Sequence, residues 1–459
     1  MRRVKKIAIL ASLLALAGLI AGLVYLQLHK GVRPHLDPDK TAYWKSDAYN
    51  YVIETDGEAV VFYNYTKDSL IPLAYGHIEK DHNLYIDKLH GHALLNAMLW
   101  KRLPMGKFEQ GTLTDDIGYQ KFFTQIDALP EVKISKFTDD PVANFEAFWQ
   151  IFNENYVLFG LTKTDWQALY SKERAKISSD TSNKELQKVM QEMIELLHDG
   201  HTQILKGMGL SSIPSKPMED EPQRLHFYMD NRKRLMKNAL SYIQGEKHSS
   251  MDGLIQAGRL RDGMGYLALN GFDRYEKEQY SKALDEAVRK LSGCSAIVVD
   301  LRFNGGGSDA FGIAAASRLA EARSLAYYKQ VRTGVSRELS EPAPIYVVPA
   351  STSIRAQKLI VLTSPYTASA GETAAMALRG IGDAVFLGEK TYGVFSDMLF
   401  NMLPNGWIVT LSAEWYTSAD GVSYEQQGLA PDEAIAIGTQ DIESRTDPVL
   451  ERAIKLLQQ

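Results

Sequence analysis

The stretch "KLIVLTSPYTASAGETAA", residues 358–375, carries the pattern on which the fold depends. Its first half, "KLIVLTS", is an apolar run that predicts a buried strand, and the alanine-rich run after Ser369 predicts a helix. Ser369 and Glu372 stand three residues apart, as in a capping box, in which each side chain accepts from a free backbone N–H of the first helical turn. The stretch therefore predicts a strand–turn–helix unit with Ser369 at the helix N-terminus.

Two roles are open for Ser369. A helix N-terminus presents free N–H groups and a partial positive charge, which would stabilise an oxyanion formed next to the serine. A plain N-cap is the more common role of a serine in this pattern. The G-x-S-x-G elbow of the α/β-hydrolases does not apply, because Thr367 stands where the first glycine would be.

Further apolar runs on both sides indicate the class of the fold. The segments "GYLALNGF" (265–272), "SAIVVDLR" (295–302) and "AVFLGE" (384–389) have the composition of strands. Helical patterns near 275–293 and 310–322 separate them. Strands that alternate with helices indicate βαβ units, so we expect an α/β core with a largely parallel sheet.

The glycine-rich segment "DLRFNGGG", residues 300–307, follows one of these strands. Consecutive glycines let backbone N–H groups converge on an anion or a carbonyl oxygen. A phosphate loop is the competing interpretation, but no Gly-Lys-Ser/Thr follows and the G-x-G-x-x-G spacing fails. A glycine-rich turn without function is the third possibility.

The segment "HDGHT", residues 198–202, ends a helical pattern. His201 lies in the turn after the helix, where a histidine can act as a general base. His198 precedes the break by one helical position and fits a solvated side chain. A lone surface histidine remains the ordinary interpretation for either residue.

Composition and hydrophobic period divide the chain into segments. Two β-rich runs flank the turn at Asp56-Gly57-Glu58, aromatic side chains recur at helical spacing within 141–201, and charges are dense within 202–262. We expect an N-terminal membrane anchor or signal sequence at 1–30, a linker at 31–42, a small β-rich domain at 43–137, a helical bundle at 138–205, a variable insertion at 206–262, an α/β core at 263–440 and a C-terminal helix at 441–459.

The N-terminus predicts a location outside the cytoplasm. The basic segment "MRRVKK" precedes an uncharged run from Ile7 to Leu28, close to the ~20 residues that span a bilayer as a helix. This run exceeds the roughly 7–15 apolar residues of a signal peptide, which favours an uncleaved anchor over cleavage and secretion. The basic residues should stay in the cytoplasm, so the rest would face the bacterial periplasm or the cell exterior.

Composition excludes several classes of site. The single cysteine, Cys294, rules out an internal disulfide and a cysteine-based zinc site. The net charge of −5 gives no sign of a nucleic-acid-binding surface. The four histidines of the β-rich segment have no clear metal-ligand geometry, so we expect neither a metal nor another cofactor. These histidines are His77, His82, His90 and His92.

Five short segments together resemble the S41 serine peptidases, the tail-specific and C-terminal processing proteases and their tricorn-core relatives. "DGHT", "DLRFNGGG", "SAGE", "GEKTYG" and "YEQQGLAPD" occur in the order seen in that family, over roughly residues 140–440. The text "NFEAFWQIFNENYVLFGLTKTDWQALY" also resembles the helical region of the tricorn-like branch. The resemblance implies a crotonase- or ClpP-like β/α superhelix for the core.

The resemblance also implies roles for individual residues. The serine of the "SAGE" segment is the family's nucleophile, which corresponds to Ser369. The glycine loop and the residue after the nucleophile resemble an oxyanion hole, which implies Gly305, Gly306 and Ala370. One branch of the family uses a lysine base, but Val394 occupies that position here.

The tricorn-like branch uses a histidine and a glutamate instead, which corresponds to His201 and Glu425. Lys390 is close in sequence to the lysine position but precedes the motif. The tricorn core has a serine just before its histidine where this chain has Gly200, so Asp199 is a possible substitute as the second contact of the base. Glu372 is then expected to be a structural cap.

We therefore predict a serine peptidase that acts on protein or peptide substrates. No segment between His201 and Gly265 resembles a PDZ domain, so recognition of C-terminal tags is not expected. The alternative is a non-catalytic protein that keeps the fold and binds a peptide or small ligand. A crotonase-type acyl-CoA enzyme would share the fold, but the predicted extracytoplasmic location argues against a CoA substrate.

Overall fold

The computed structural model describes most of the chain after residue 31. The described residues are 32–92, 96, 102–206, 211–214, 222–273, 276–332 and 338–458. No helix among them is long and apolar enough to cross a membrane. The predicted anchor or signal sequence at residues 1–30 lies outside this part of the chain and stays a prediction.

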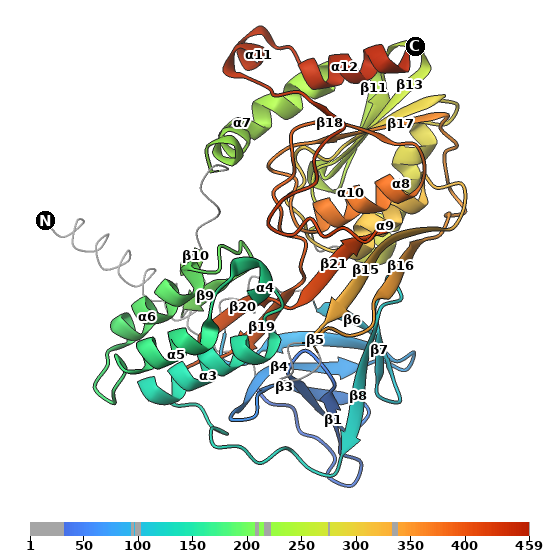
Figure 1. Cartoon of the computed structure of the whole chain (residues 1–459). Helices are drawn as coiled ribbons and strands as arrows, with labels where there is room; N and C mark the ends of the chain where they lie inside the picture. Colours follow the sequence, from blue (N-terminus) through green and yellow to red (C-terminus); the bar gives the residue numbers. More distant parts are fainter. Residues whose placement is uncertain are drawn as a thin grey trace, which may run out of the picture.

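A closed barrel of antiparallel strands forms the N-terminal domain (Figure 1). Its first strand pairs with its last, which closes the barrel and leaves no free edge. Apolar side chains such as Ile53, Phe62, Leu84 and Phe108 are buried together in its core. The prediction of a small β-rich N-terminal domain is confirmed. The strands are β1 (Ala42–Ser46), β2 (Tyr51–Thr55), β3 (Ala59–Tyr65), β4 (Leu70–Ile78), β5 (Asn83–Leu89), β6 (Leu103–Glu109), β7 (Thr112–Thr114) and β8 (Gln120–Ile126).

A helical region follows the barrel. Asp140 caps its first helix, accepting hydrogen bonds from the N–H groups of Val142 and Ala143 at 3.2 and 3.3 Å. Trp149 and Trp166 are buried, and each indole N–H donates to the other residue's carbonyl at 3.1 Å. The aromatic side chains at helical spacing therefore form core. The helices are α3 (Pro141–Asn155), α4 (Phe159–Thr162), α5 (Trp166–Arg174) and α6 (Asn183–Glu195).

A four-stranded sheet lies beside these helices and joins distant parts of the chain (Figure 1). Strand β9 begins two residues after His201, and it pairs antiparallel with β20 of the hairpin formed by β19 and β20. This pairing fixes the turn of His201 to the C-terminal third of the chain. The sheet order is β10 (Ser211–Pro214), β9 (Gln203–Lys206), β20 (Ile408–Ser412) and β19 (Met398–Met402).

The α/β core is built on a seven-stranded sheet, and the predicted α/β core with a largely parallel sheet is confirmed. Its order is β11 (Gln244–Ser250), β12 (Ile255–Arg259), β13 (Met264–Leu269), β14 (Ala296–Asp300), β17 (Lys358–Thr363), β18 (Val385–Gly388) and β22 (Glu433–Ala434). The pairs from β13 to β22 are parallel. All five residues of β14 are buried, as expected for a strand covered on both faces. The accompanying helices are α8 (Lys277–Lys290), α9 (Asp309–Ser317) and α10 (Ala370–Gly380).

The segment 206–262 differs from the expected variable insertion. Helix α7 (Pro222–Ser241) leads into β11 and β12, which extend the core sheet beyond β13 through two antiparallel pairings. Residues of α7, among them Tyr228 and Leu235, are buried in a hydrophobic cluster with Val298 and Leu362 of the sheet. Strand β11 is an edge strand whose residues are mostly exposed. The sheet therefore begins at residue 244, and the polar composition of its edge strand hides this in the sequence.

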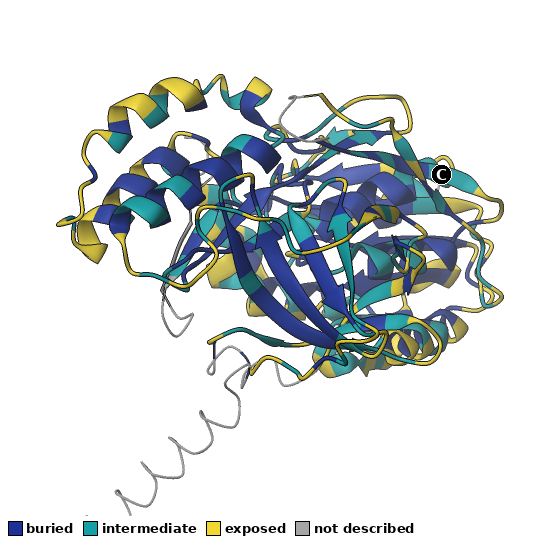
Figure 2. Cartoon of the chain, turned by 90° about the horizontal axis from the view of Figure 1, so that it is seen from below, coloured by how far each residue is buried: buried dark blue, intermediate teal, exposed yellow. Residues whose placement is uncertain are grey.

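A third sheet lies between the core and the barrel (Figure 1). It has the order β16 (Ala343–Val347), β15 (Ser324–Val331) and β21 (Glu414–Ser418). Tyr49 of the barrel donates to Glu414 Oε1 at 2.6 Å, and Lys329 of β15 lies 2.6 Å from Glu414 Oε2. Both Lys329 and Glu414 are buried. Figure 2 shows that the strands are largely buried and that exposed residues lie on outer helix faces and loops.

A buried ion-pair network attaches the C-terminal helices to the sheet. These helices are α11 (Thr439–Ser444) and α12 (Pro448–Leu457). Arg302 follows β14 and is fully buried. Its guanidinium pairs with Asp300 at 2.6 Å and, through two hydrogen bonds of 2.8 Å, with Asp447 before α12.

We predict that Arg302→Met destabilises the protein by about 3–5 kcal/mol, because two buried carboxylates lose their common partner. Urea unfolding followed by tryptophan fluorescence measures this change. Arg452→Met on α12 is the matched control. Its partner Glu433 is 43% exposed, and the pair is worth at most about 1 kcal/mol. Equal effects of the two substitutions would contradict the assignment of the buried network.

Candidate active site

Ser369 lies at the junction between β17 and α10, as the strand–turn–helix pattern predicts. It is the N-cap residue of α10 and has φ +53° and ψ −125°. A non-glycine residue in this region is strained by roughly 1–3 kcal/mol and is held there by its surroundings. The Ser369 hydroxyl makes no capping hydrogen bond to the helix. The side chain is therefore not used as a cap, although the sequence around it fits one.

The glycine loop after β14 packs directly against Ser369. A Cβ atom on Gly306 would lie 2.8 Å from Ser369 Cβ and 3.3 Å from the Ala370 nitrogen, so only glycine fits there. Ala368 donates its N–H to the Asn304 carbonyl at 3.1 Å, which fixes the loop to the turn. The structure thus brings Gly306, Ser369 and Ala370 together.

The three predicted oxyanion donors are not equivalent. The N–H of Gly306 donates to the Asn304 side-chain oxygen at 2.9 Å. Within the described chain, the N–H groups of Gly305 and Ala370 have no such acceptor. Gly305 is exposed, and Ala370 begins α10. The free donors at this point are therefore Gly305 and Ala370, while Gly306 provides the close approach. Asn304, which sequence reasoning did not single out, positions the loop.

Glu372 is fully buried and collects four donors. It accepts from the N–H of Ser369 at 3.1 Å, the Thr391 hydroxyl at 2.5 Å, and the N–H groups of Gly393 and Val394 at 2.7 and 2.8 Å. Burial raises the pKa of Glu372 to about 7, although these donors lower it. The carboxyl joins the start of α10 to the loop at Val394, which is more than a cap does.

His201 lies in the turn between α6 and β9. Its backbone N–H donates to Asp199 Oδ1 at 2.9 Å, and its carbonyl accepts from the Thr410 hydroxyl at 2.6 Å. The residue is buried, and its Nδ1 has no hydrogen-bond partner in the described structure. His198 is exposed, in agreement with a solvated side chain. Asp199 thus contacts the His201 backbone through Oδ1.

Glu425 is buried beside the loop at residues 391–396. Its Oε2 accepts from the N–H groups of Phe395 and Ser396 at 3.0 and 2.8 Å. Burial, followed by the nearby charges of Asp199 and Glu372, raises the pKa of Glu425 well above its usual value. Its Oε1 has no hydrogen-bond partner among the described residues. Glu425 therefore keeps one acceptor unused, and the charge of Asp199 acts on its carboxyl.

The loop at residues 391–396 connects these groups. A Cβ on Gly200 would lie 3.0 Å from the Tyr392 ring and 3.1 Å from a Val394 methyl group, so the turn before His201 packs against this loop. The same loop binds Glu372 and Glu425 through backbone N–H groups. Lys390, just before the loop, is exposed, whereas Val394 is buried.

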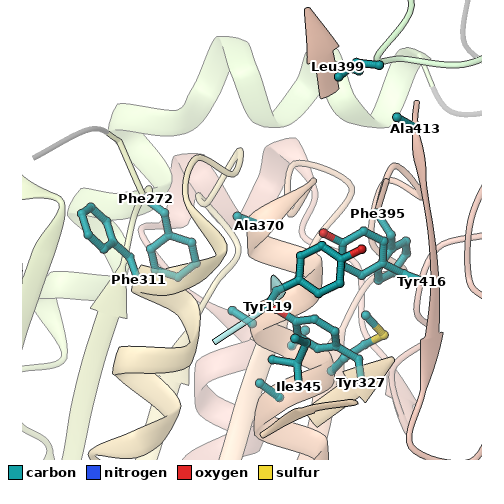
Figure 3. Close-up of a cluster of buried hydrophobic side chains, with 14 of the residues drawn as sticks. Tyr119, Phe272, Phe311, Tyr327, Ile345, Ala370, Phe395, Leu399, Ala413 and Tyr416 are labelled. Carbon is teal, nitrogen blue, oxygen red and sulfur yellow. The ribbon is translucent and has the colours of Figure 1, made fainter. Parts of the chain in front are cut away.

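A charged cluster beside the site has no signal in the sequence. Lys329 lies 3.5 Å from Asp397, which follows the loop and is 55% exposed. The positive charge of Lys329, followed by that of Lys121, lowers the pKa of Asp397 below its usual value. Figure 3 shows Tyr119 of the barrel beside Tyr327 and Tyr416, near this cluster. These residues meet only because the barrel, β15 and β21 converge.

Comparison with known proteins agrees with this geometry. Residues 263–435 match peptidase family S41, and residues 138–195 match the tricorn protease C1 domain. A solved structure from Parabacteroides merdae, described as a candidate peptidase, is 28% identical with a TM-score of 0.60. The likeness covers 70% of this chain and 97% of that chain.

Curated relatives match over a shorter range. A carboxyl-terminal-processing protease from Picosynechococcus is 30% identical over 200 residues, which are 43% of this chain and 45% of the relative. A chloroplastic C-terminal processing peptidase from Tetradesmus obliquus is 27% identical over 38% of this chain and 36% of the relative. The chain thus spans less than half the length of these relatives. The predicted resemblance to peptidase family S41 is confirmed over residues 263–435, and a region similar to the tricorn protease C1 domain precedes it.

Proposed function

We propose that the protein is a serine peptidase that hydrolyses peptide bonds of protein or peptide substrates outside the cytoplasm. Ser369 is the nucleophile, His201 the general base and Glu425 the residue that supports the base. The observation that carries the proposal is the strained conformation of Ser369 at the start of α10, with the glycine loop against it. Strain of this kind concentrates at functional sites.

The proposed reaction follows from these positions. His201 takes the proton of the Ser369 hydroxyl as the oxygen attacks the carbonyl carbon of the scissile bond. The N–H groups of Ala370 and Gly305 stabilise the oxyanion, helped by the positive end of the α10 dipole. His201 then gives its proton to the leaving amine, and water hydrolyses the acyl-enzyme by the same steps.

The unpaired atoms around His201 support its role as the base. A buried polar atom without a partner is uncommon and calls for an explanation. Both His201 Nδ1 and Glu425 Oε1 are in this condition within the described structure. In apo enzymes the catalytic hydrogen bonds are often loose and tighten when substrate binds. We infer that substrate binding completes the contact between base and carboxyl, directly or through one intervening group.

Glu372 has a positioning role in this proposal. Its four hydrogen bonds keep the Ser369 backbone and the loop at Val394 in one arrangement. It accepts from the backbone of the nucleophile and makes no hydrogen bond to its hydroxyl. Its raised pKa therefore affects stability near neutral pH rather than the proton transfer itself.

We predict that Ser369→Ala abolishes peptide hydrolysis and labelling by a fluorophosphonate probe. The free energy of unfolding should change by less than about 1 kcal/mol, because the hydroxyl makes no capping bond. Mass spectrometry of the labelled peptide identifies Ser369 as the site. Hydrolysis by the alanine variant at the wild-type rate would refute the assignment.

The base is tested by a matched pair of variants. His201→Ala should lose activity by at least about a thousandfold, since the base and nucleophile act as a unit. Lys390→Ala should keep wild-type activity, because Lys390 is exposed and precedes the loop. An essential Lys390 with a dispensable His201 would reverse the assignment. A Ser369 that is not labelled, in a protein that hydrolyses no peptide, would favour the non-catalytic ligand-binding alternative.

The raised pKa of Glu372 predicts a pH effect on stability. The folded protein keeps a proton on Glu372 up to about pH 7, whereas the unfolded chain releases it near 4.5. The folded state thus binds the extra proton, and stability falls as pH rises through this window. Between pH 4.5 and about pH 7, the free energy of unfolding should fall by up to about 3 kcal/mol more in the wild type than in Glu372→Gln.

Chemical unfolding at a series of pH values measures this difference. The control is Glu321→Gln, which changes an exposed carboxyl and should follow the wild-type profile. Parallel profiles for the wild type and Glu372→Gln would show that Glu372 does not hold the extra proton.

A further inference from the structure

A cavity of about 250 Å³ lies between the barrel and strands β19 and β21. Its lining is largely apolar, and both the barrel and strands β19 and β21 contribute to it. The barrel contributes Leu73, Ile86 and Met105, and the other wall contains Leu399 and Phe400. An apolar hollow of this size accommodates a large aliphatic or aromatic side chain.

A second cavity of about 330 Å³ begins at the glycine loop. Gly307 and Ser308 form one wall, and they follow Gly306, which touches Ser369. The barrel forms the opposite wall through β6 and the turn before β8. The cavity therefore lies within a few residues of the proposed nucleophile.

The second cavity has an excess of negative charge. Its lining includes four aspartates and two lysines, Asp115, Asp116, Asp309, Asp397, Lys277 and Lys329. Both lysines already have carboxylate partners, because Lys277 pairs with Asp116 at 2.7 Å and Lys329 with Glu414 at 2.6 Å. A cationic group is the complement of such a surface.

The two cavities are neighbours. Leu103, Met105 and Asp397 line both of them. Asp397 also follows the loop that Glu372 ties to the start of α10. The barrel wall is held in place by the buried contacts of Tyr49 and Lys329 with Glu414.

Resting on the proposed peptidase function, we propose that the N-terminal barrel forms one wall of the substrate cleft and selects the peptide. The apolar cavity takes a large apolar side chain, and the acidic cavity takes a lysine or arginine side chain close to it in the same peptide. The barrel thereby helps to select the substrate sequence beside Ser369. The acidic wall disfavours a substrate side chain that carries a carboxylate at this position.

The experiment compares cleavage of a peptide library by the full chain and by three variants, with products identified by mass spectrometry. Met105→Lys places a cation at the wall shared by the cavities. Asp116→Asn removes one negative charge at an exposed position. Phe122→Lys is the control, because Phe122 is 54% exposed on the same barrel and lines neither cavity.

The wild type and Phe122→Lys should both cleave peptides with neighbouring apolar and basic residues. Met105→Lys should lower kcat/KM for these peptides at least about tenfold. It should also reduce the difference in kcat/KM between these peptides and analogues that carry an acidic residue in place of the basic one. Asp116→Asn should lower the preference for the basic residue several-fold. Fluorophosphonate labelling of Ser369 should be unchanged in Phe122→Lys and should still occur in the other two variants.

Labelling separates the two proposals. If Ser369 is labelled and peptides are cleaved, but neither Met105→Lys nor Asp116→Asn alters selectivity, the cleft proposal is overturned while the peptidase function stands. If Ser369 is not labelled in the wild type and no peptide is cleaved, the peptidase function fails and the cleft proposal fails with it.

Discussion

The buried carboxyl of Glu372 is the interaction on which the rest of the site depends. It binds the backbone of Ser369 on one side and the N–H groups of Gly393 and Val394 on the other. It joins the start of α10 to the loop that leads to the Glu425 contacts, beside the backbone hydrogen bond that Tyr392 N–H donates to the Thr367 carbonyl at 2.9 Å. An ionisable group is costly to bury, and the convergence of four donors offsets that cost.

The parallel sheet explains why the glycine loop and Ser369 meet. Strands β14 and β17 are neighbours, and Asp300 pairs with Leu362 near the end of each strand. The loop with Asn304 and the turn with Ser369 therefore leave the same edge of the sheet. The carboxyl edge of a parallel sheet is where α/β proteins commonly place their sites. His201 does not belong to this sheet. The pairing of β9 with β20 holds its turn in place.

Local patterns were sufficient for part of this architecture. The strand–turn–helix unit at Ser369 and the glycine loop follow from short-range signals of period and glycine content. Strand β11 could not be predicted, because an edge strand exposed to water has no apolar alternation. Asp397 and Lys329 are far apart in sequence, so their contact depends on the tertiary fold. The catalytic roles of the named residues remain predictions.

The most direct measurement of the central claim is a crystal structure of the full chain with a peptidyl boronate, which mimics the tetrahedral intermediate. The account predicts a covalent bond from boron to Ser369 Oγ. One boronate oxygen should lie about 2.7–3.1 Å from the N–H nitrogens of Ala370 and Gly305, and the other should face His201. A boronate bound to another residue, or an oxygen directed away from both N–H groups, would contradict the account.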